Sequence, residues 1–232
     1  MKPKFYFDIQ QHIFDPMDKF NFQTSPEWLE LRANRLTASF ASELLAKGKS
    51  SDGLGKSIKK RLAKRLMQKW TGWVDDESVS WQDKEAVLRG IQYESEALEW
   101  YQLTTGRNTV PCGFVERGKY LGCSPDSFVV DGEGIAMAQI KIPMPGNFID
   151  AIMDYSEYIS QIEMELFVCD LEKSDLVIYS PELKTGKIIP VRRNRDTDRE
   201  ILSKMKAAVR FQREVTKEIN RLRGENDSNC LE

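Results

Sequence analysis

Four residues whose side chains bind metal ions or move protons lie within predicted elements or at the start of one. Glu94 lies in a predicted helix, Asp126 begins a predicted strand, and Gln139 and Lys141 lie in a later strand. Because alternate side chains of a strand share a face, Gln139 and Lys141 are expected to point the same way, with Ile140 pointing into the opposite layer. The strand would therefore place an oxygen ligand beside a lysine.

These residue types favour hydrolysis of a phosphodiester. Hard cations such as Mg²⁺ or Mn²⁺ prefer oxygen ligands, which makes Glu94, Asp126 and the amide oxygen of Gln139 candidate metal ligands. Lys141 would orient or deprotonate the attacking water and stabilise the charge that develops at phosphorus. Uncatalysed phosphodiester cleavage needs an acceleration of ~10¹⁵-fold or more, which favours metal assistance.

Other chemistries lack their residues. The four cysteines, Cys112, Cys123, Cys169 and Cys230, form no C-x-x-C pair, and His12 is the only histidine. Neither a disulfide framework nor a zinc site has ligands at usable spacing. A Ser-His-Asp or Cys-His mechanism would depend on His12, and no nucleophile motif surrounds it.

Length and composition indicate a globular protein. The 232 residues are 41% hydrophobic and 10% aromatic, enough to bury a core. Lys and Arg total 34 against 36 Asp and Glu, so the net charge is −2 and any nucleic-acid site must be local. No apolar run reaches 18 residues, and charged residues occupy the N-terminus where a signal peptide is apolar, so we expect a cytoplasmic protein with no membrane partner.

The elements that must position these residues alternate in type. Periodicity predicts helices at about 26–32, 56–70, 84–105, 155–166 and 196–223. Short strands are predicted as a meander at 110–116, 120–123, 127–131 and 135–142, and two more at 175–179 and 187–191. This order predicts an α/β fold with a central mixed β-sheet flanked by helices. We expect an N-terminal extension at 1–25, one domain at 26–225 and a flexible tail at 226–232.

One predicted helix is strongly basic. Lys56, Lys60 and Lys64 lie among seven Lys and Arg residues around its apolar Ile58 and Leu62 stripe. The cationic side is either a solvated surface or a contact with DNA phosphates.

Five short motifs follow one another between about Trp28 and Val168. They are Trp28-Leu-Glu-Leu-Arg32 with Leu36-Thr-Ala-Ser39, Gly90-Ile-Gln-Tyr-Glu94, Cys123-Ser124-Pro-Asp126, Gln139-Ile-Lys141-Ile-Pro143 and Tyr158-Ile-Ser-Gln161-Ile162. Each motif alone is weak, but their shared order is specific. With them, the sequence resembles the lambda exonuclease type of phage alkaline exonuclease, the YqaJ-like viral recombinase branch of the PD-(D/E)xK nucleases.

The resemblance implies a PD-(D/E)xK restriction-endonuclease-like core and a role for each matching residue. Glu94, Asp126, the Gln139 position and the backbone carbonyl of Ile140 would bind the metal, and Lys141 would be the catalytic lysine. The 5′-phosphate of the digested strand would be held by Arg32, Ser39, Ser124 and Gln161.

The resemblance also implies an activity and partners. Relatives are toroidal homotrimers that take linear double-stranded DNA ends, digest one strand 5′ to 3′ and leave a 3′ single strand for a single-strand-annealing protein in phage recombination. Val87 or Leu88 stands about where the family has an apolar wedge that parts the terminal base pairs.

One position departs from the family pattern. Gln139 stands where the family has an acidic ligand, which keeps an oxygen but removes a negative charge. The change is either an engineered or natural inactivating substitution, or a tolerated variant such as the Q-x-K site of the Mrr-like branch; impaired activity is the favoured reading. The alternatives to the exonuclease are a catalytically inactive DNA-end-binding module and a structure-selective endonuclease of the same fold.

Overall fold

The structure is a computed structural model that describes residues 2–5, 26–33, 35–72, 81–131 and 134–224. The predicted tail at 226–232, His12, Cys230 and most of the predicted extension at 1–25 lie outside the described residues.

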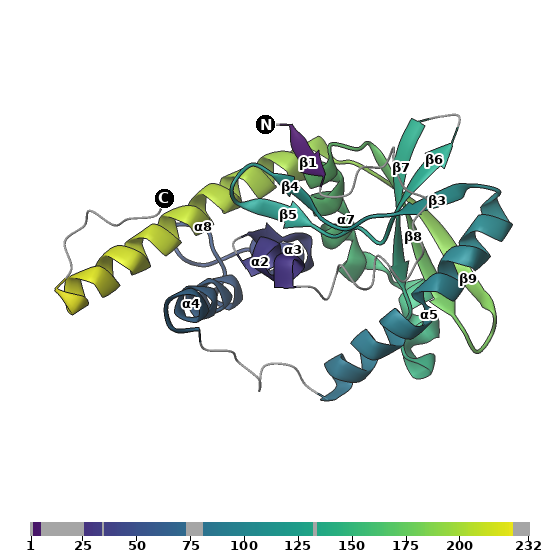
Figure 1. The fold of residues 1–232 in the computed structure, drawn as a ribbon, viewed down its shortest axis with the longest axis horizontal. Coiled ribbons are helices and arrows are strands. Elements are labelled where there is room, and N and C mark those ends of the chain that lie inside the picture. The colour runs from purple at the N-terminus through teal and green to yellow at the C-terminus, as the bar shows by residue number, and fades with distance from the viewer. Residues whose placement is uncertain (1, 6–25, 34, 73–80, 132–133, 225–232) are drawn as a thin grey trace.

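A five-stranded mixed sheet forms the larger layer of the molecule (Figure 1). Its strands, in spatial order, are β3 (Asn108–Pro111), β6 (Ser127–Asp131), β7 (Gly134–Lys141), β8 (Lys173–Ser180) and β9 (Thr185–Arg192). Only the β7–β8 pair is parallel, because the long crossover between these strands contains two helices. The sheet confirms the predicted α/β fold with a mixed sheet flanked by helices.

Helices cover both faces of this sheet. On one face, Ala97 and Tyr101 of α5 (Trp81–Thr105) pack in a core cluster with Ala138 and Ile140. On the other face, the cluster containing Met137 includes buried residues of α7 (Ser156–Cys169). Alternate residues of β7 therefore point to opposite layers, as the sequence predicted.

A second, four-stranded sheet packs against α7. Its order is β1 (Pro3–Phe5), β4 (Val115–Arg117), β5 (Leu121–Cys123) and β2 (Leu36–Thr37), with β5 and β2 parallel. Gly122 is needed in β5 because a Cβ there would lie 2.4 Å from Cζ of Phe114.

The meander predicted from Val110 to Ile142 is therefore wrong. The expected strand at 110–116 splits into β3 and β4, which lie in different sheets. Pro111 has no N–H to continue a ladder, and the segment after it turns Cys112 and Phe114 into the core. This turn carries the chain from one sheet to the other.

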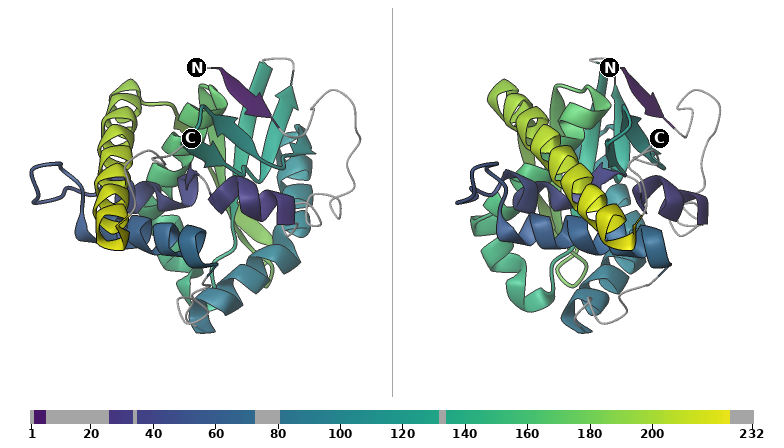
Figure 2. Two further views of the ribbon diagram at one scale, coloured as in Figure 1. Left: turned by 60° about the vertical axis from the view of Figure 1, so that its left-hand side comes forward. Right: turned by 90° about the vertical axis from the view of Figure 1, so that its left-hand side faces the viewer.

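The remaining helices enclose the sheets. They are α2 (Pro26–Ala33), α3 (Ala41–Leu45), α4 (Lys56–Thr71), α6 (Phe148–Met153) and α8 (Arg195–Arg223), with 3₁₀ turns at Ala38–Phe40 and Pro145–Asn147. The predicted stripe of α4 is buried at Ile58, Leu62 and Leu66. Helix α8 lies across α4 and also contacts α3 and α7 (Figure 2). None of the described helices has the length and hydropathy to span a membrane.

Candidate active site

Asp126 is held against the strand that carries Gln139 and Lys141. The β6–β7 ladder reaches Ser127 opposite Ala138, so Asp126 stands opposite Gln139, one residue beyond the last pair. Its Oδ2 accepts a hydrogen bond of 2.7 Å from the backbone N–H of Ile140. This bond fixes the carboxylate at the end of β6.

Gln139 presents an oxygen to which no described residue donates a hydrogen bond. The residue is 3% exposed, and its Oε1 accepts no hydrogen bond from the part of the chain that the structure describes. A buried acceptor without a donor costs about 1–3 kcal/mol. The N–H and C=O of one strand residue point to the same side, so the Ile140 carbonyl faces the Asp126 side of β7. These are the kinds of oxygen that a hard cation prefers as ligands.

Glu94 lies on the side of α5 that faces the sheet. It is half-buried and stands three residues before Ala97 and seven before Tyr101, both of which are fully buried there. Across the described residues, no three His, Cys, Asp or Glu side chains group as a metal site. The candidate donor set contains two carboxylates, Glu94 and Asp126, because its third side chain is the Gln139 amide.

Lys141 is the first of three side chains joined by hydrogen bonds, and the other two, Gln161 and Glu165, belong to α7. Its Nζ donates to Oε1 of Gln161 at 3.1 Å, and Nε2 of Gln161 donates to Oε1 of Glu165 at 2.8 Å. The ammonium also lies 5.7 Å from the ring centre of Tyr158. Gln161 and Glu165 share a face because they are four residues apart on the helix. The row fixes which end of the Gln161 amide faces Lys141.

Arg32, Ser39 and Ser124 gather around Trp28. The Trp28 indole N–H donates to Oγ of Ser124 at 3.0 Å, and the Arg32 guanidinium stacks 4.4 Å from the indole centre. An Nη atom of Arg32 lies 3.5 Å from Oγ of Ser39, which is also hydrogen-bonded to Thr37 at 3.0 Å. Two hydroxyl groups and a guanidinium therefore share one site.

A second arginine stands against this site. Arg65 of α4 donates a hydrogen bond to the backbone carbonyl of Arg32. Burial, reinforced by the neighbouring cations Arg32 and Arg61, lowers the pKa of Arg65 to about 10, and burial also lowers the pKa of Arg32. Repulsion between half-buried cations would be relieved by an anion bound between them.

The backbone between Ser124 and Asp126 joins the two halves of the site. Ser124 accepts a hydrogen bond from Trp28, on whose ring Arg32 stacks, whereas Asp126, two residues later, accepts one from the backbone N–H of Ile140 beside Lys141. Of the four residues predicted to hold the 5′-phosphate, Gln161 contacts Lys141 directly, whereas Arg32, Ser39 and Ser124 form a separate group around Trp28.

The predicted DNA-contacting residues lie farther out. Val87 and Leu88 are 58% and 65% exposed on α5, and Val87 stands seven residues, ~10 Å of helix, before Glu94. Lys56 and Lys60 are exposed on α4, whereas Lys64 is half-buried.

Three further residues belong to the site although the sequence analysis did not predict it: Trp28, Arg65 and Glu165. Trp28 lies in the first motif, which was a usable signal. Arg65 follows Arg61 by four residues, and Glu165 follows Gln161 by four, but these spacings also suit solvated helix faces. No local sequence pattern distinguished Arg65 and Glu165 from solvated helix residues.

Three comparisons place the chain among known proteins. Residues 27–172 match the YqaJ-like viral recombinase domain. The structure resembles the alkaline exonuclease LHK-Exo of Laribacter hongkongensis with a TM-score of 0.70 and 22% identity, over 86% of this chain and 98% of that chain; a crystal of LHK-Exo with dAMP gives the same values. It also resembles a phage-related exonuclease of Haemophilus somnus 129PT with a TM-score of 0.66 and 12% identity, over 82% of this chain and 98% of that one.

No curated protein sequence matches the chain significantly. At these identities, the solved structures establish the fold, which is that of the alkaline exonucleases. The domain match covers more than half of the sequence and contains all five motifs. The chain therefore belongs to the YqaJ-like viral recombinase family.

Proposed function

We propose that this protein is a metal-dependent deoxyribonuclease that digests one strand of linear double-stranded DNA from its 5′ end and leaves a 3′ single-stranded overhang. The observation that carries the proposal is that Ser124, which lies with Arg32 around Trp28, precedes Asp126 by two residues, and that Asp126 is bonded to the backbone beside Lys141, which contacts Gln161. A pocket for a terminal phosphate beside a hydrolytic lysine suits an exonuclease, because an internal phosphodiester needs no terminal pocket.

The residues of the pocket have the chemistry for a terminal phosphate. Arg32 offers a charge-assisted grip, Ser39 and Ser124 offer hydroxyl donors, and Arg65 adds positive charge beside them. The Nε2 of Gln161 is the remaining donor, and it is held by Glu165 in the free protein. LHK-Exo has been crystallised with dAMP, a nucleotide that carries such a phosphate.

The hydrolytic side is built from β7. Lys141, fixed by Gln161, would orient the attacking water and stabilise negative charge on the phosphate oxygens. Glu94, Asp126, Gln139 Oε1 and the Ile140 carbonyl are the oxygens that would hold Mg²⁺ or Mn²⁺. When bound, the ion supplies charge neutralisation and Lewis-acid activation of the phosphate.

Gln139 sets the level of this activity. An amide gives the cation an oxygen but no negative charge, so the affinity for metal falls relative to a carboxylate at the same position. We therefore expect impaired cleavage with retained binding of DNA ends.

The test is release of acid-soluble nucleotides from linear 5′-phosphorylated duplex in Mg²⁺ or Mn²⁺. The chain is compared with Gln139→Glu and with Asp126→Ala. Faster digestion by Gln139→Glu, with none by Asp126→Ala, is expected. Equal digestion by the chain and Gln139→Glu would show a competent Gln site.

Two alternatives have distinct outcomes in the same assay. If none of the three proteins digests DNA while the chain still binds duplex ends, it is an end-binding module, the alternative that Gln139 favours. Cleavage of closed circular duplex would instead show an endonuclease.

The partners follow from the same proposal. We expect a homotrimer that encloses the duplex, and a single-strand-annealing protein that receives the overhang in phage or prophage recombination within the host cytoplasm. Sedimentation of the chain with and without a duplex end tests the trimer.

A further inference from the structure

A row of cations on α8 has no acidic partner among the residues that the structure describes. Lys206, Arg210, Arg213 and Lys217 are spaced at four, three and four residues, so they form one stripe about 16 Å long. All four are exposed, and among the described residues none forms an ion pair or hydrogen bond. Like charges at this spacing repel one another.

Other arginines on the same helix are paired. Arg199 is bound to Asp196, and Arg221 donates to Glu218 at 2.7 Å. Glu214 stands on the flank of the stripe, and no ion pair joins it to a described residue. The helix thus neutralises cations near its ends and leaves four together in the middle.

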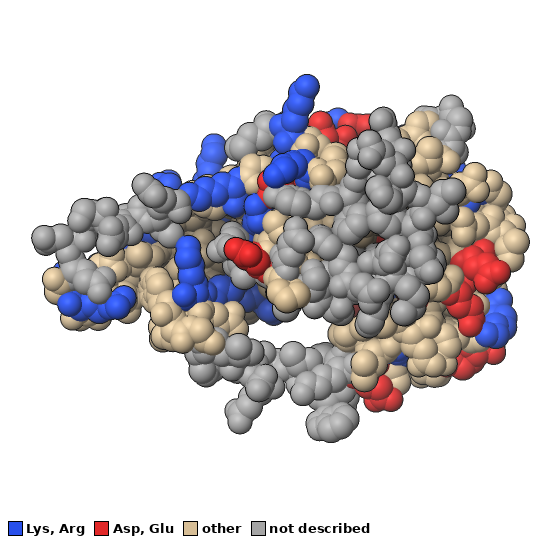
Figure 3. All heavy atoms as spheres, viewed as in Figure 1, with Lys and Arg blue, Asp and Glu red and all other residues tan. Residues whose placement is uncertain are grey.

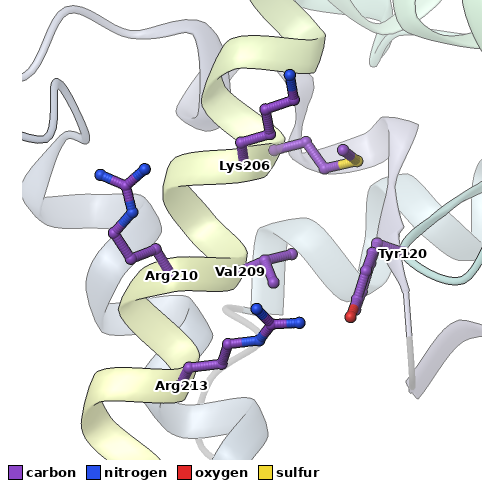
Figure 4. A pocket seen from close by; sticks show the side chains of 6 residues that line it. Tyr120, Lys206, Val209, Arg210 and Arg213 are labelled. Atoms are coloured by element: carbon purple, nitrogen blue, oxygen red, sulfur yellow. The ribbon is translucent and has the colours of Figure 1, made fainter.

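The stripe borders a cavity with apolar walls. The space has a volume of about 310 Å³ and lies between α8 and the turn that precedes β5, lined by Tyr120, Met205, Lys206, Val209, Arg210 and Arg213. In Figure 4, Val209 and Arg213 point toward the ring of Tyr120, whereas Arg210 points away from it. The cavity therefore combines a half-buried aromatic ring with a cationic rim.

This combination suits one nucleotide of a single strand. Proteins that bind single-stranded nucleic acid combine aromatic rings on which bases stack with cations that follow the phosphates. In a duplex, the base faces are already stacked and cannot enter an apolar cavity. The volume lies at the lower end of that of small-molecule sites.

The cavity is connected with the candidate active site. Tyr120 accepts a hydrogen bond of 2.8 Å at its carbonyl from Leu36 N–H, so it is tied to the segment that carries Ser39. Tyr120 and Ser124 stand at opposite ends of β5, which separates them by about 13 Å along the strand.

We propose that the α8 groove, defined by Tyr120, Val209 and the stripe Lys206, Arg210, Arg213 and Lys217, binds single-stranded DNA. A base stacks against Tyr120 and the stripe contacts the phosphates. This role rests on the proposed function: the groove retains the undigested strand while the other strand is removed.

The test measures binding of the full chain to a fluorescent 20-nucleotide oligothymidylate, by anisotropy, in EDTA at several salt concentrations. Arg210→Gln/Arg213→Gln is compared with Arg199→Gln/Arg221→Gln, which removes equal charge from paired positions of the same helix. The first variant is expected to weaken binding by about tenfold and to reduce the salt slope by about 1.4, since each single-strand phosphate contact contributes about 0.7. The control variant is expected to bind as the unaltered chain does.

Tyr120 tests the stacking. Tyr120→Leu is expected to weaken binding severalfold, and Tyr120→Phe to retain it, because a phenyl ring still stacks. Equal weakening of duplex binding in Arg210→Gln/Arg213→Gln, with no effect of Tyr120→Leu, would overturn the proposal in favour of duplex phosphates. A change in molecular mass of that double variant would overturn it in favour of a subunit interface.

Failure of this proposal differs from failure of the nuclease. If Gln139→Glu digests duplex but neither Arg210→Gln/Arg213→Gln nor Tyr120→Leu alters oligothymidylate binding, the single-strand site is refuted and the nuclease proposal stands. If Arg210→Gln/Arg213→Gln and Tyr120→Leu weaken binding as expected but neither the unaltered chain nor Gln139→Glu digests DNA, the single-strand site stands and the nuclease proposal is refuted.

Discussion

Gln161 contacts two groups at once, and its orientation decides what Lys141 meets. Because Glu165 accepts from Nε2, Oε1 is the atom that faces the lysine. Glu165 is 1% exposed, so water does not compete for this bond. Glu165 is thereby a positioning residue for the proposed reaction.

Glu165→Gln is expected to lower kcat on linear duplex by about tenfold. A carboxylate only accepts, whereas the new amide also offers N–H groups, so the ~1–1.5 kcal/mol preference that holds Nε2 of Gln161 toward position 165 is lost and its N–H groups can turn toward Lys141. The assay is made in the Gln139→Glu background. KM for DNA and the melting temperature should stay near their original values. Glu163→Gln is the matched control, since Glu163 lies on the same helix and accepts from Thr197 at 3.2 Å. Equal loss in both variants would indicate a general effect on α7.

The basic helix α4 has two sides with different roles. Its inward cation Arg65 reaches the backbone of Arg32, whereas Lys56 and Lys60 project into solvent. The two hypotheses, a solvated helix face and a contact with DNA, therefore concern only the outer side of α4, which carries Lys56 and Lys60.

Charge reversal at Lys60 separates these hypotheses. If α4 contacts a duplex phosphate, Lys60→Glu reduces the slope of log affinity against log salt by at least about 0.9. Lys69→Glu, at the end of the same helix and on another side, is the control and should leave the slope unchanged. Identical slopes for Lys60→Glu and the unaltered chain would show that this side is only solvated.

Asp170 follows the last residue of α7 and joins this helix to β4 and to the segment between β9 and α8. Its Oδ1 accepts from Arg193 at 2.9 Å and from Arg117 of β4 at 3.2 Å, and its backbone is left-handed with φ of 59°. These contacts, the hydrogen bond from Arg193 foremost, lower the pKa of the carboxyl group.

Because the folded pKa lies below the unfolded value of about 3.9, this stabilisation is present above that pH and is lost as pH falls through the folded pKa. Asp170→Asn tolerates the same backbone. It is expected to lower the melting temperature by ~2–4 °C at pH 7, equivalent to about 1 kcal/mol for a half-exposed group. Melting curves should converge with those of the unaltered chain in strong acid; a constant difference would show that the loss is steric.

At the scale of the whole molecule, opposite charges are separated on the face that Figure 3 shows. In Figure 3, Lys and Arg gather over the half of the visible face that contains α4 and α8, and Asp and Glu gather toward α5 and β9. A net charge of −2 therefore conceals a local basic surface that suits a polyanion.

The assembly and the predicted wedge are tested together. We expect a mass three times the 26.8 kDa of one chain. If the apolar Leu88 side chain parts base pairs as proposed, Leu88→Glu is expected to keep this mass and to slow digestion of blunt duplex more than digestion of duplex with an unpaired 5′ end. Leu103→Glu, 80% exposed on the same helix, is the control. A monomeric Leu88→Glu would place Leu88 in a subunit interface instead.

The amino-acid sequence by itself determined the elements and the family. The periodicity of α4, the strand at 127–131 and the alternation of Gln139, Ile140 and Lys141 depend on neighbours a few residues apart, and the structure agrees with each. The motif order, which needs no geometry, identified the family. Pro111 was a local signal for the break between β3 and β4, but its consequence was the transfer of the chain to a second sheet, which no local pattern specifies.

Only the tertiary structure decided which side chains meet. Trp28 and Ser124 are 96 residues apart, and Asp126 and Ile140 are 14 apart across a strand pair. Such contacts depend on how the chain closes its loops and on the register of its strands, which many distant residues fix together. For the same reason, the unpartnered oxygen of Gln139, the arginine pair Arg32 and Arg65, and the open stripe of α8 became visible only once the chain was folded.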